Sequence, residues 1–402
     1  MLDDLPYVSR DPIVGLMAEV SEDTNPEKID LGAGVYRNDS GITPVFDAVR
    51  LAERQLWESN HTKTYTKQTG PDGALEAIQE LILGKAYKLL STRLAGTITA
   101  GGTGAIRTGA ELILRNGITP TVWLSNPTWS NHERIFSLLG FKVRYYDFLD
   151  DHSNQLVPQR IFDALKDSQE NDILLLHGCC HNPTGIDLSN EIWKELAILA
   201  QKRKLIPFID LAYQGFGESV SKDVYNLQEL LECENLIIAT SCSKNFGLYR
   251  ERVGSLTVLC QNNKQKMRVQ ENINNITRTL YSFPPAHGAF IVKEILQSES
   301  LRKLWQDELA AYVNRIKWVK ERLVNEVNSL SGSLLDLSYI KNQQGMFSFL
   351  KINPKAVSEL RKKHSIYMTE NGRINVTGLS ASNLSLFSQR LTDILLKIEN
   401  RK

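Results

Sequence analysis

One short stretch, SCSKNFGLYRERVG from Ser241 to Gly254, gathers side chains that bind anions and attack carbonyl groups. Lys244 follows two serines, Ser241 and Ser243, and stands eight positions before Arg252. A lysine amine has an ordinary pKa of about 10.4 and must lose its proton before it attacks an aldehyde. Cationic neighbours and a desolvated pocket both favour the neutral amine, and a guanidinium fork matches two phosphate oxygens. The stretch alone leaves two interpretations open, a nucleophilic amine beside an anion site or two ordinary surface charges.

A second reactive group, Asp210, closes the apolar run IPFID. An unpaired carboxylate at the end of a buried strand is costly to desolvate, so it needs a positive partner. That partner is either a structural cation, a helix N-terminus or the protonated ring nitrogen of a ligand. Tyr213, three residues further on, offers a phenol to the same ligand.

A glycine-rich turn in TAGGTGAIRTGAELIL directly precedes an amphipathic helical pattern. Exposed backbone N–H groups and the positive end of the helix favour an anion there, with Gly101 and Gly102 allowing close approach and Thr103 adding a hydroxyl. The spacing matches neither the dinucleotide fingerprint nor the P-loop, so an ordinary tight turn remains an equal alternative. Trp129 follows a Pro-Thr turn, where it either packs in the core or stacks on a planar ligand.

The stretch HGCCH sets His177, Cys179, Cys180 and His181 close together and suggests a metal site. Its spacing fits no standard zinc pattern, and no second Cys/His pair follows at finger or ribbon distance. Adjacent cysteines also do not easily ligate one tetrahedral ion. We therefore expect no metal and two buried thiols.

These residues follow short apolar runs that alternate with helical patterns over residues 97–260. The helical pattern is clearest in SNEIWKELAILAQKRK, where Ser189 is a candidate N-cap and Ile192, Leu196 and Leu199 recur at helical spacing. Strand, helix and strand in this order imply right-handed crossovers and a mostly parallel sheet covered by helices. Ligands bind beyond the carboxyl ends of such strands, so the reactive residues should meet at one edge. The expected strands are 121–125, 141–148, 173–178, 206–210, 235–241 and 254–260.

The rest of the chain predicts a second, smaller domain. Single cores rarely grow past roughly 250 to 300 residues, and this chain has 402. We expect a large α/β domain over residues 45–310 and a smaller α+β domain, with an N-terminal arm, from residues 1–44 and 311–402. The later elements are a long helix over 301–330, a helix near 357–363, the strand GRINVTG over 372–378 and a last helix near 384–398.

Composition excludes several classes of protein. The formal net charge is +1, with 47 basic and 46 acidic residues, so no global field would gather nucleic acid or an anionic membrane. The start, MLDDLPYVSR, lacks the pattern of a secretory signal, and no apolar run approaches the roughly 20 residues of a membrane span. Five cysteines without a regular framework fit reduced thiols, so we expect a cytoplasmic protein.

Ten stretches, in order along nearly the whole chain, resemble the class I, fold-type I aminotransferases, in particular the aspartate and aromatic amino-acid branch. These enzymes use pyridoxal 5′-phosphate (PLP). The resemblance implies PLP-transferase fold type I, an α/β fold, and it puts the family's cofactor-linking lysine on Lys244. The stretches are LGAGVYRNDSG, TYTKQTG, GGTGAIR, SNPTWSNH, HGCCHNPTG, IDLAYQGFG, SKNFGLYRERVG, YSFPPAHG, GMFSF and GRINVTG.

The resemblance also implies how the cofactor is held. Asp210 would pair with the ring nitrogen, with His132 supporting it from behind. Tyr213 and Asn182 would bond the ring phenolate oxygen, and Trp129 would stack on the ring. The phosphate would be bound by Gly102, Thr103, Ser241, Ser243 and Arg252, and by Tyr65 of the partner subunit.

For the substrate, the resemblance implies two arginines. Arg373 would clamp the α-carboxylate, with Gly34 at the rim and Trp129 and Asn182 alongside. Arg278 would cross a dimer interface to bind the distal carboxylate of a dicarboxylic substrate. The aspartate branch usually reads Tyr-Ser-Asn-Pro-Pro just after this arginine, whereas Phe283 here replaces the asparagine.

The implied activity is a PLP-dependent, ping-pong transamination by a homodimer with shared active sites. It would move the amino group of aspartate or glutamate to 2-oxoglutarate or oxaloacetate, with Lys244, Asp210 and Tyr213 as catalytic residues. The alternative is an aromatic enzyme for tyrosine and phenylalanine, or a broad aspartate/aromatic enzyme. A PLP-dependent lyase or decarboxylase could share Lys244 and Asp210, but the pair Arg278 and Arg373 speaks against it. A protein that only binds partners would have little reason to keep these side chains.

Overall fold

The computed structural model describes residues 2–8, 11–59, 62–150 and 155–399. The chain forms two compact units, and each is described by itself. The larger unit is Pro44–Asn314, and the smaller unit combines Met1–Thr43 with Arg315–Lys402. Within the described residues, no helix is long and apolar enough to cross a membrane.

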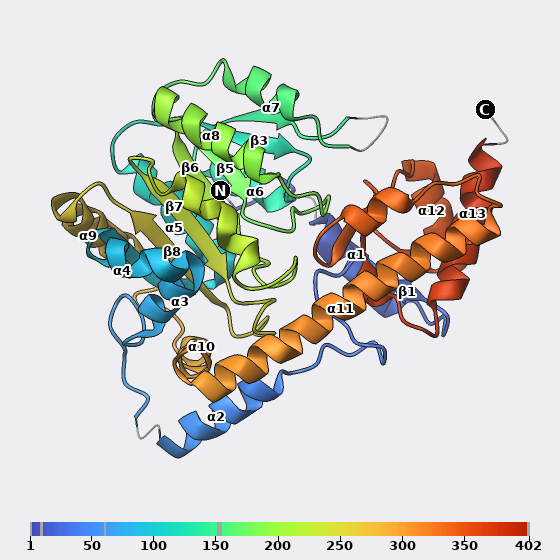
Figure 1. Ribbon diagram of the computed structural model, residues 1–402, viewed down its shortest axis with the longest axis horizontal. Coiled ribbons are helices and arrows are strands. Elements are labelled where there is room, and N and C mark those ends of the chain that lie inside the picture. Colours follow the sequence, from blue (N-terminus) through green and yellow to red (C-terminus); the bar gives the residue numbers. More distant parts are fainter. Residues whose placement is uncertain (1, 9–10, 60–61, 151–154, 400–402) are drawn as a thin grey trace. The chain divides into compact units, whose positions relative to one another are not determined.

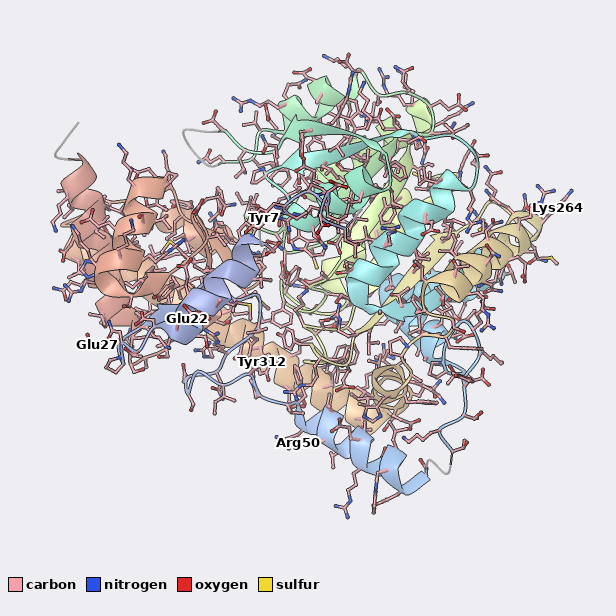
Figure 2. The ribbon with its side chains drawn as sticks, turned by 180° about the vertical axis from the view of Figure 1, so that it is seen from behind. Tyr7, Glu22, Glu27, Arg50, Lys264 and Tyr312 are labelled. Carbon is pink, nitrogen blue, oxygen red and sulfur yellow. The ribbon has the colours of Figure 1, made fainter. Side chains whose placement is uncertain are left out.

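The larger unit is built on a seven-stranded sheet with the order β2-β8-β7-β6-β5-β3-β4, and helices lie on both of its faces (Figures 1 and 2). The interior strand β5 is buried at every position, as expected for a strand covered on both sides. The prediction of a mostly parallel sheet covered by helices is therefore confirmed. The strands are β2 (Leu94–Ala100), β3 (Thr121–Asn126), β4 (Lys142–Asp147), β5 (Ile173–His177), β6 (Ile206–Leu211), β7 (Leu236–Ser241) and β8 (Val253–Leu259).

One strand breaks the parallel pattern. β8 runs antiparallel to both of its neighbours, β2 and β7, while the other strand pairs are parallel. Ala100 at the end of β2 pairs with Val253 at the start of β8, and Ser241 at the end of β7 pairs with Gly254. Arg252, the residue just before β8, therefore lies at the edge of the sheet where the neighbouring strands β2 and β7 end.

The helices of the larger unit begin and end at recognisable signals. α8 has Ser189 as its N-cap, whose side chain accepts a hydrogen bond from the N–H of Ile192, as the sequence predicted. α9 begins at Asn263, and the side chain of its N-cap, Asn262, accepts a hydrogen bond from the N–H of Gln265. Lys264, labelled in Figure 2, marks this end of the helix. The helices are α2 (Asp47–Ser59), α3 (Ala74–Leu83), α4 (Tyr87–Leu90), α5 (Gly101–Leu114), α6 (Ser130–Leu138), α7 (Pro158–Leu165), α8 (Asn190–Arg203), α9 (Asn263–Leu280) and α10 (His287–Gln297), with 3₁₀ turns at Gly84–Ala86, Ser91–Arg93 and Lys222–Leu230.

The core of the larger unit lies between the sheet and the helices α5 and α6. Ala105 and Ala110 of α5 and Phe136 of α6 are fully buried in it. The Phe136 ring meets Phe141 and Phe208 edge-on, with centroids 5.2 and 5.9 Å apart. This packing fixes the start of α5 against the sheet, because the helix is anchored along its buried side.

The long helix α11 (Glu299–Leu330) begins in the larger unit and continues into the smaller one. In the larger unit its residue Tyr312, labelled in Figure 2, packs against Phe46 with ring centroids 4.8 Å apart.

The smaller unit combines helices with two short two-stranded sheets, β1–β10 parallel and β9–β11 antiparallel. The predicted strand over 372–378 is correct only at its start. β11 ends at Asn375 because that side chain accepts the N–H of Thr377 and turns the chain into a 3₁₀ helix. The elements are α1 (Pro12–Glu22), β1 (Ile29–Asp30), β9 (Phe347–Phe349), α12 (Pro354–His364), β10 (Ile366–Tyr367), β11 (Arg373–Asn375) and α13 (Leu384–Glu399), with 3₁₀ turns at Ser338–Asn342 and Val376–Gly378.

Candidate active site

The start of α5 is shaped to hold an anion. The helix begins at Gly101, and the residue before it, Ala100, has no side-chain group that could cap the first N–H groups. Gly101 has a φ of 72°, and a Cβ on it would come within 2.4 Å of Nη2 of Arg252. A Cβ on Gly102 would lie 2.9 Å from that of Ser241. The two glycines therefore let a cation and a serine approach the positive end of the helix.

The antiparallel strand brings Arg252 into this cluster. Its Nη1 lies 3.3 Å from Oγ of Ser243, its Nη2 donates to the carbonyl of Ala100, and its own carbonyl accepts from the N–H of Gly101. Ser241 is joined to the cluster because its Oγ accepts the N–H of Ser243. The structure thus brings together all the predicted phosphate-binding residues of the larger unit except Tyr65, with Thr103 in the first turn of α5.

Lys244 is half-buried at the same edge, with its Nζ 4.8 Å from the ring centroid of Tyr213. Loss of water around the amine lowers the pKa of Lys244 to about 8. The negative charge of Asp210 opposes this shift, and the positive charge of Arg252 adds to it. An amine with a pKa near 8 is partly neutral at physiological pH, which a nucleophilic lysine requires.

Asp210 is a buried carboxylate that stays ionised. Burial by itself would raise its pKa, but the hydrogen bond and charge of His132, followed by His177 and Lys244, outweigh burial, so the pKa of Asp210 is lowered. Nε2 of His132 lies 3.0 Å from Oδ2 of Asp210. Since an ionised carboxylate only accepts, His132 donates through Nε2. The predicted support of Asp210 by His132 is thus present as a direct hydrogen bond.

Two further residues continue this chain of hydrogen bonds, and the sequence did not single them out for it. Oγ1 of Thr128 lies 2.9 Å from Nδ1 of His132 and 3.2 Å from Nε2 of His177. Burial, and then the charge of His132, lowers the pKa of His177 to about 3, so its imidazole is neutral near pH 7. Hydrogen bonds at both of its ring nitrogens, to Thr128 and to Asp210, fix the orientation of the His132 ring. The sequence signal for Thr128 is its spacing of four residues from His132, just before the start of α6 (Ser130–Leu138).

The remaining ring-binding candidates border the same edge. Tyr213 and Asn182 are buried, at 5% and 6% exposure. Trp129 is half-buried just before α6, and its ring meets that of His132 edge-on at 5.2 Å. Trp129 also packs against the core of the unit.

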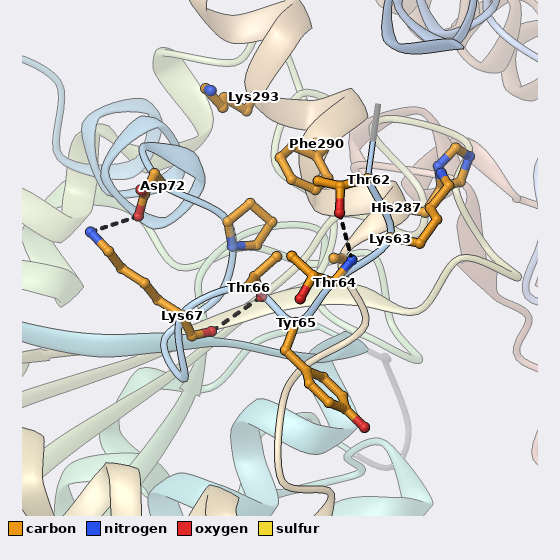
Figure 3. Close-up of a pocket in the computed structure, with 12 residues that line it drawn as sticks. Thr62, Lys63, Thr64, Tyr65, Thr66, Lys67, Asp72, His287, Phe290 and Lys293 are labelled. Carbon is orange, nitrogen blue, oxygen red and sulfur yellow. Dashed lines mark hydrogen bonds and ion pairs between the residues drawn. The ribbon is translucent and has the colours of Figure 1, made fainter. Parts of the chain in front are cut away.

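Two residues of the larger unit that the sequence predicted for the active site, Tyr65 and Arg278, lie on the surface of the unit and not in the cluster around Lys244. Tyr65 is 80% exposed on a loop that borders a pocket of about 550 Å³, and Figure 3 shows its side chain pointing away from Phe290 and Lys293. The same loop carries an ion pair of 2.7 Å between Lys67 and Asp72. Arg278 is exposed near the end of α9. Neither residue belongs to the cluster around Lys244 within this chain's described contacts.

The smaller unit holds the other two candidates, Arg373 and Gly34. Arg373 on β11 is buried, its guanidinium lies 4.5 Å from the ring centroid of Phe347, and its Nη2 donates to the carbonyl of Gly32 at 2.7 Å. Asn375 donates to the carbonyls of residues 33 and 35. These bonds hold the segment with Gly34 against β11. Phe347 was not predicted as a site residue, although its stretch GMFSF was recognised.

Cys179 and Cys180 of the larger unit are buried thiols, as the sequence predicted. Within the described residues, ligand atoms of Cys179, Cys180 and Asp223 lie within 4.8 Å of one another. The pKa of Cys179 is raised well above its ordinary value, first by its hydrogen bond with Cys180 and then by burial, so the thiol is protonated. The absence of a metal stays a prediction. The carboxylate of Asp223 already accepts the backbone N–H groups of Gly215, Gly217, Glu218 and Ser219.

Comparison with known proteins identifies the family. Residues 26–391 match the family described as aminotransferase class I and II. Aspartate aminotransferase of Escherichia coli (strain K12) is 38% identical over 400 residues, covering 98% of this chain and 100% of the relative. Aromatic-amino-acid aminotransferase of Pseudomonas aeruginosa is 38% identical over 389 residues, covering 96% and 97%.

Solved structures agree with this result. The aromatic-amino-acid aminotransferase from Burkholderia pseudomallei, covalently bound to pyridoxal phosphate, has a TM-score of 0.95 at 35% identity and covers 98% of this chain and 99% of its own. The aspartate aminotransferase from the cytoplasm of Saccharomyces cerevisiae also has a TM-score of 0.95, at 29% identity, with 99% of each chain covered. Both the sequence and the fold therefore place this chain in the aminotransferase class I and II family, as an enzyme of the aspartate and aromatic amino-acid type.

Proposed function

We propose that this aminotransferase moves the amino group of aspartate or glutamate to 2-oxoglutarate or oxaloacetate in two alternating half-reactions. The observation that carries the proposal is the pair formed by Lys244 and Asp210. One is an amine with a pKa of about 8, and the other is a buried carboxylate with a lowered pKa at the same strand edge. The aspartate aminotransferases among the relatives support this choice of substrate.

The residues of the larger unit fit pyridoxal 5′-phosphate. The cofactor has a phosphate, a basic ring nitrogen and an aldehyde. The glycine turn with Arg252 would hold the phosphate, Asp210 the protonated ring nitrogen and Lys244 the aldehyde carbon. Each of the three groups of the cofactor thus has a partner of matching chemistry: a cation and backbone N–H groups, a carboxylate, and a nucleophilic amine.

When bound, PLP draws electrons away from the α-carbon of the substrate and keeps the amine between the half-reactions. The protein has three tasks. Asp210, held ionised by His132, would keep the ring nitrogen protonated. Lys244 would take the proton from the substrate α-carbon at its neutral Nζ and deliver it to the former aldehyde carbon of the cofactor. Tyr213, which packs against Lys244, would orient the amine.

Substrate selection would depend on two guanidinium groups, because a fork of N–H donors matches a carboxylate. Arg373 would bind the α-carboxylate, with Gly34 beside it. Arg278 would bind the distal carboxylate in the active site of the other subunit of a homodimer, and Tyr65 of the partner subunit would reach the phosphate. The exposure of Tyr65 and Arg278 supports this arrangement. In this proposal the larger unit binds the cofactor, and the smaller unit supplies Arg373, which binds the α-carboxylate of the substrate.

The second candidate is an enzyme for aromatic amino acids, or for both classes. It is favoured by the aromatic-amino-acid aminotransferases among the relatives and by the aromatic Phe283 beside Arg278. A cytoplasmic location is favoured by the five free, buried cysteines, because such thiols persist in a reducing compartment.

The decisive experiment measures formation of the 2-oxo acid product from aspartate, phenylalanine and tyrosine with 2-oxoglutarate as acceptor. Lys244→Ala should abolish turnover and the visible absorption of the protein-bound cofactor. As a control, Lys303→Ala removes a lysine that is exposed and paired with Asp307, and it should leave both unchanged. Full activity of Lys244→Ala would refute the proposal.

A further inference from the structure

The turn after α9 folds an aromatic ring back onto Arg278. The N–H groups of Tyr281 and Ser282 both donate to the carbonyl of Thr277, which ends the helix. Ser282 has a φ of 69°, and its Oγ accepts a hydrogen bond from Nη1 of Arg278. The guanidinium carbon of Arg278 then lies 5.5 Å from the ring centroid of Phe283. The side chain of Arg278 is thus held in place by its own turn.

The ring of Phe283 has a second neighbour. It stacks with Tyr65, with ring centroids 4.8 Å apart and planes inclined by 22°. Tyr65 projects from the loop drawn in Figure 3, and all of these residues belong to the larger unit. The guanidinium of Arg278 therefore lies on a ring that is itself packed against Tyr65.

The position occupied by Arg278 competes with binding of a carboxylate. A cation over an aromatic face is attracted to the ring, and it must leave the ring when it turns to an anion elsewhere. An aspartate side chain offers such an anion, whereas the side chain of phenylalanine carries no charge. The cost of leaving Phe283 therefore falls on dicarboxylic substrates alone.

We propose that Phe283 is a specificity-determining residue, which retains Arg278 on its ring and thereby shifts the enzyme toward aromatic amino acids. The inference rests on the proposed function, in which Arg278 binds the distal carboxylate. A dicarboxylate draws the guanidinium away from the ring. With an aromatic substrate the guanidinium stays on Phe283, and no unpaired charge faces the substrate.

The test measures kcat/KM for aspartate and for phenylalanine in single half-reactions of the cofactor-loaded enzyme. Phe283→Leu keeps an apolar side chain but removes the aromatic face. It should raise the aspartate-to-phenylalanine ratio by about two- to fivefold, the size of an exposed cation–π contact. Phe283→Tyr keeps the face and should preserve the wild-type ratio. Phe283→Met replaces the leucine variant if that protein does not fold.

A double-mutant cycle shows whether Phe283 acts through Arg278. In an Arg278→Ala background, Phe283→Leu should leave the ratio unchanged, because no guanidinium remains to be held. An unchanged ratio in Phe283→Leu alone would overturn the inference. The same shift with and without Arg278 would overturn it as well, since Phe283 would then contact the substrate directly. A wild-type enzyme that transfers no amine from either substrate would instead refute the proposed function.

Discussion

At the scale of single residues, the protonation of Lys244 controls when the site can react with an aldehyde. Desolvation first, and Arg252 in addition, lower the pKa of this amine to about 8, and Asp210 acts in the opposite direction. Below this pH the amine is protonated and cannot attack, and above it the amine is neutral. We predict that the rate at which cofactor-free protein attaches saturating PLP rises with pH and levels off above about 8.

Two variants test the cause of that midpoint. Asp210→Asn removes the charge that raises the pKa, so the midpoint should move to lower pH. Arg252→Gln removes a charge that lowers it, so the midpoint should move to higher pH. Stopped-flow absorbance at each pH gives the rates. Shifts in the same direction for both variants, or a midpoint near the ordinary lysine value of about 10.4, would contradict this account of the amine.

At the scale of elements, the first turn of α5 depends on a glycine for two separate reasons. Gly101 has a φ of 72°, and a Cβ there would displace the guanidinium of Arg252. We predict that Gly101→Ala weakens PLP binding by about tenfold or more, the loss expected from one charge-assisted hydrogen bond. Fluorescence or absorbance titration of the cofactor-free protein measures the affinity.

A matched control lies just beyond the other end of the same helix. Gly117 has a φ of 75°, and a Cβ there would meet nothing within 4 Å. Gly117→Ala should therefore lower the melting temperature through backbone strain, as Gly101→Ala does, but leave PLP affinity unchanged. Equal affinities of the two variants would show that Arg252 does not depend on the glycine.

At the scale of the whole molecule, the active sites should be shared between two subunits. We predict that Lys244→Ala and Arg278→Ala proteins, each poorly active on aspartate, recover activity when they are dissociated and reassembled together. In a hybrid dimer one site combines an intact Lys244 with an intact Arg278, so a statistical mixture should reach about one quarter of wild-type activity. Reassembled Lys244→Ala alone is the control. No recovery, or an active monomer in sedimentation, would mean that each chain completes its own site.

Much of the fold follows from local patterns. Ser189 caps α8 as expected, and the six expected strands match β3 to β8 to within one residue at each end. β2 was not among them, since its run LAGTITA is rich in small residues and gives a weak strand signal. The strand over 372–378 is too long in the prediction because Asn375 bonds to the backbone two residues on and ends it.

The sequence by itself determined the reactive groups, since a lysine between serines, a carboxylate at a strand end and a glycine turn are local features, and their order matches a family. The tertiary structure decided how they act together. Only the antiparallel pairing of β8 brings Arg252 to the edge where β2 and β7 end. Only packing lowers the pKa of Lys244, joins Asp210 to His132 and lays Arg278 on Phe283. These effects depend on desolvation and on distances between residues far apart in the chain, which local sequence does not encode.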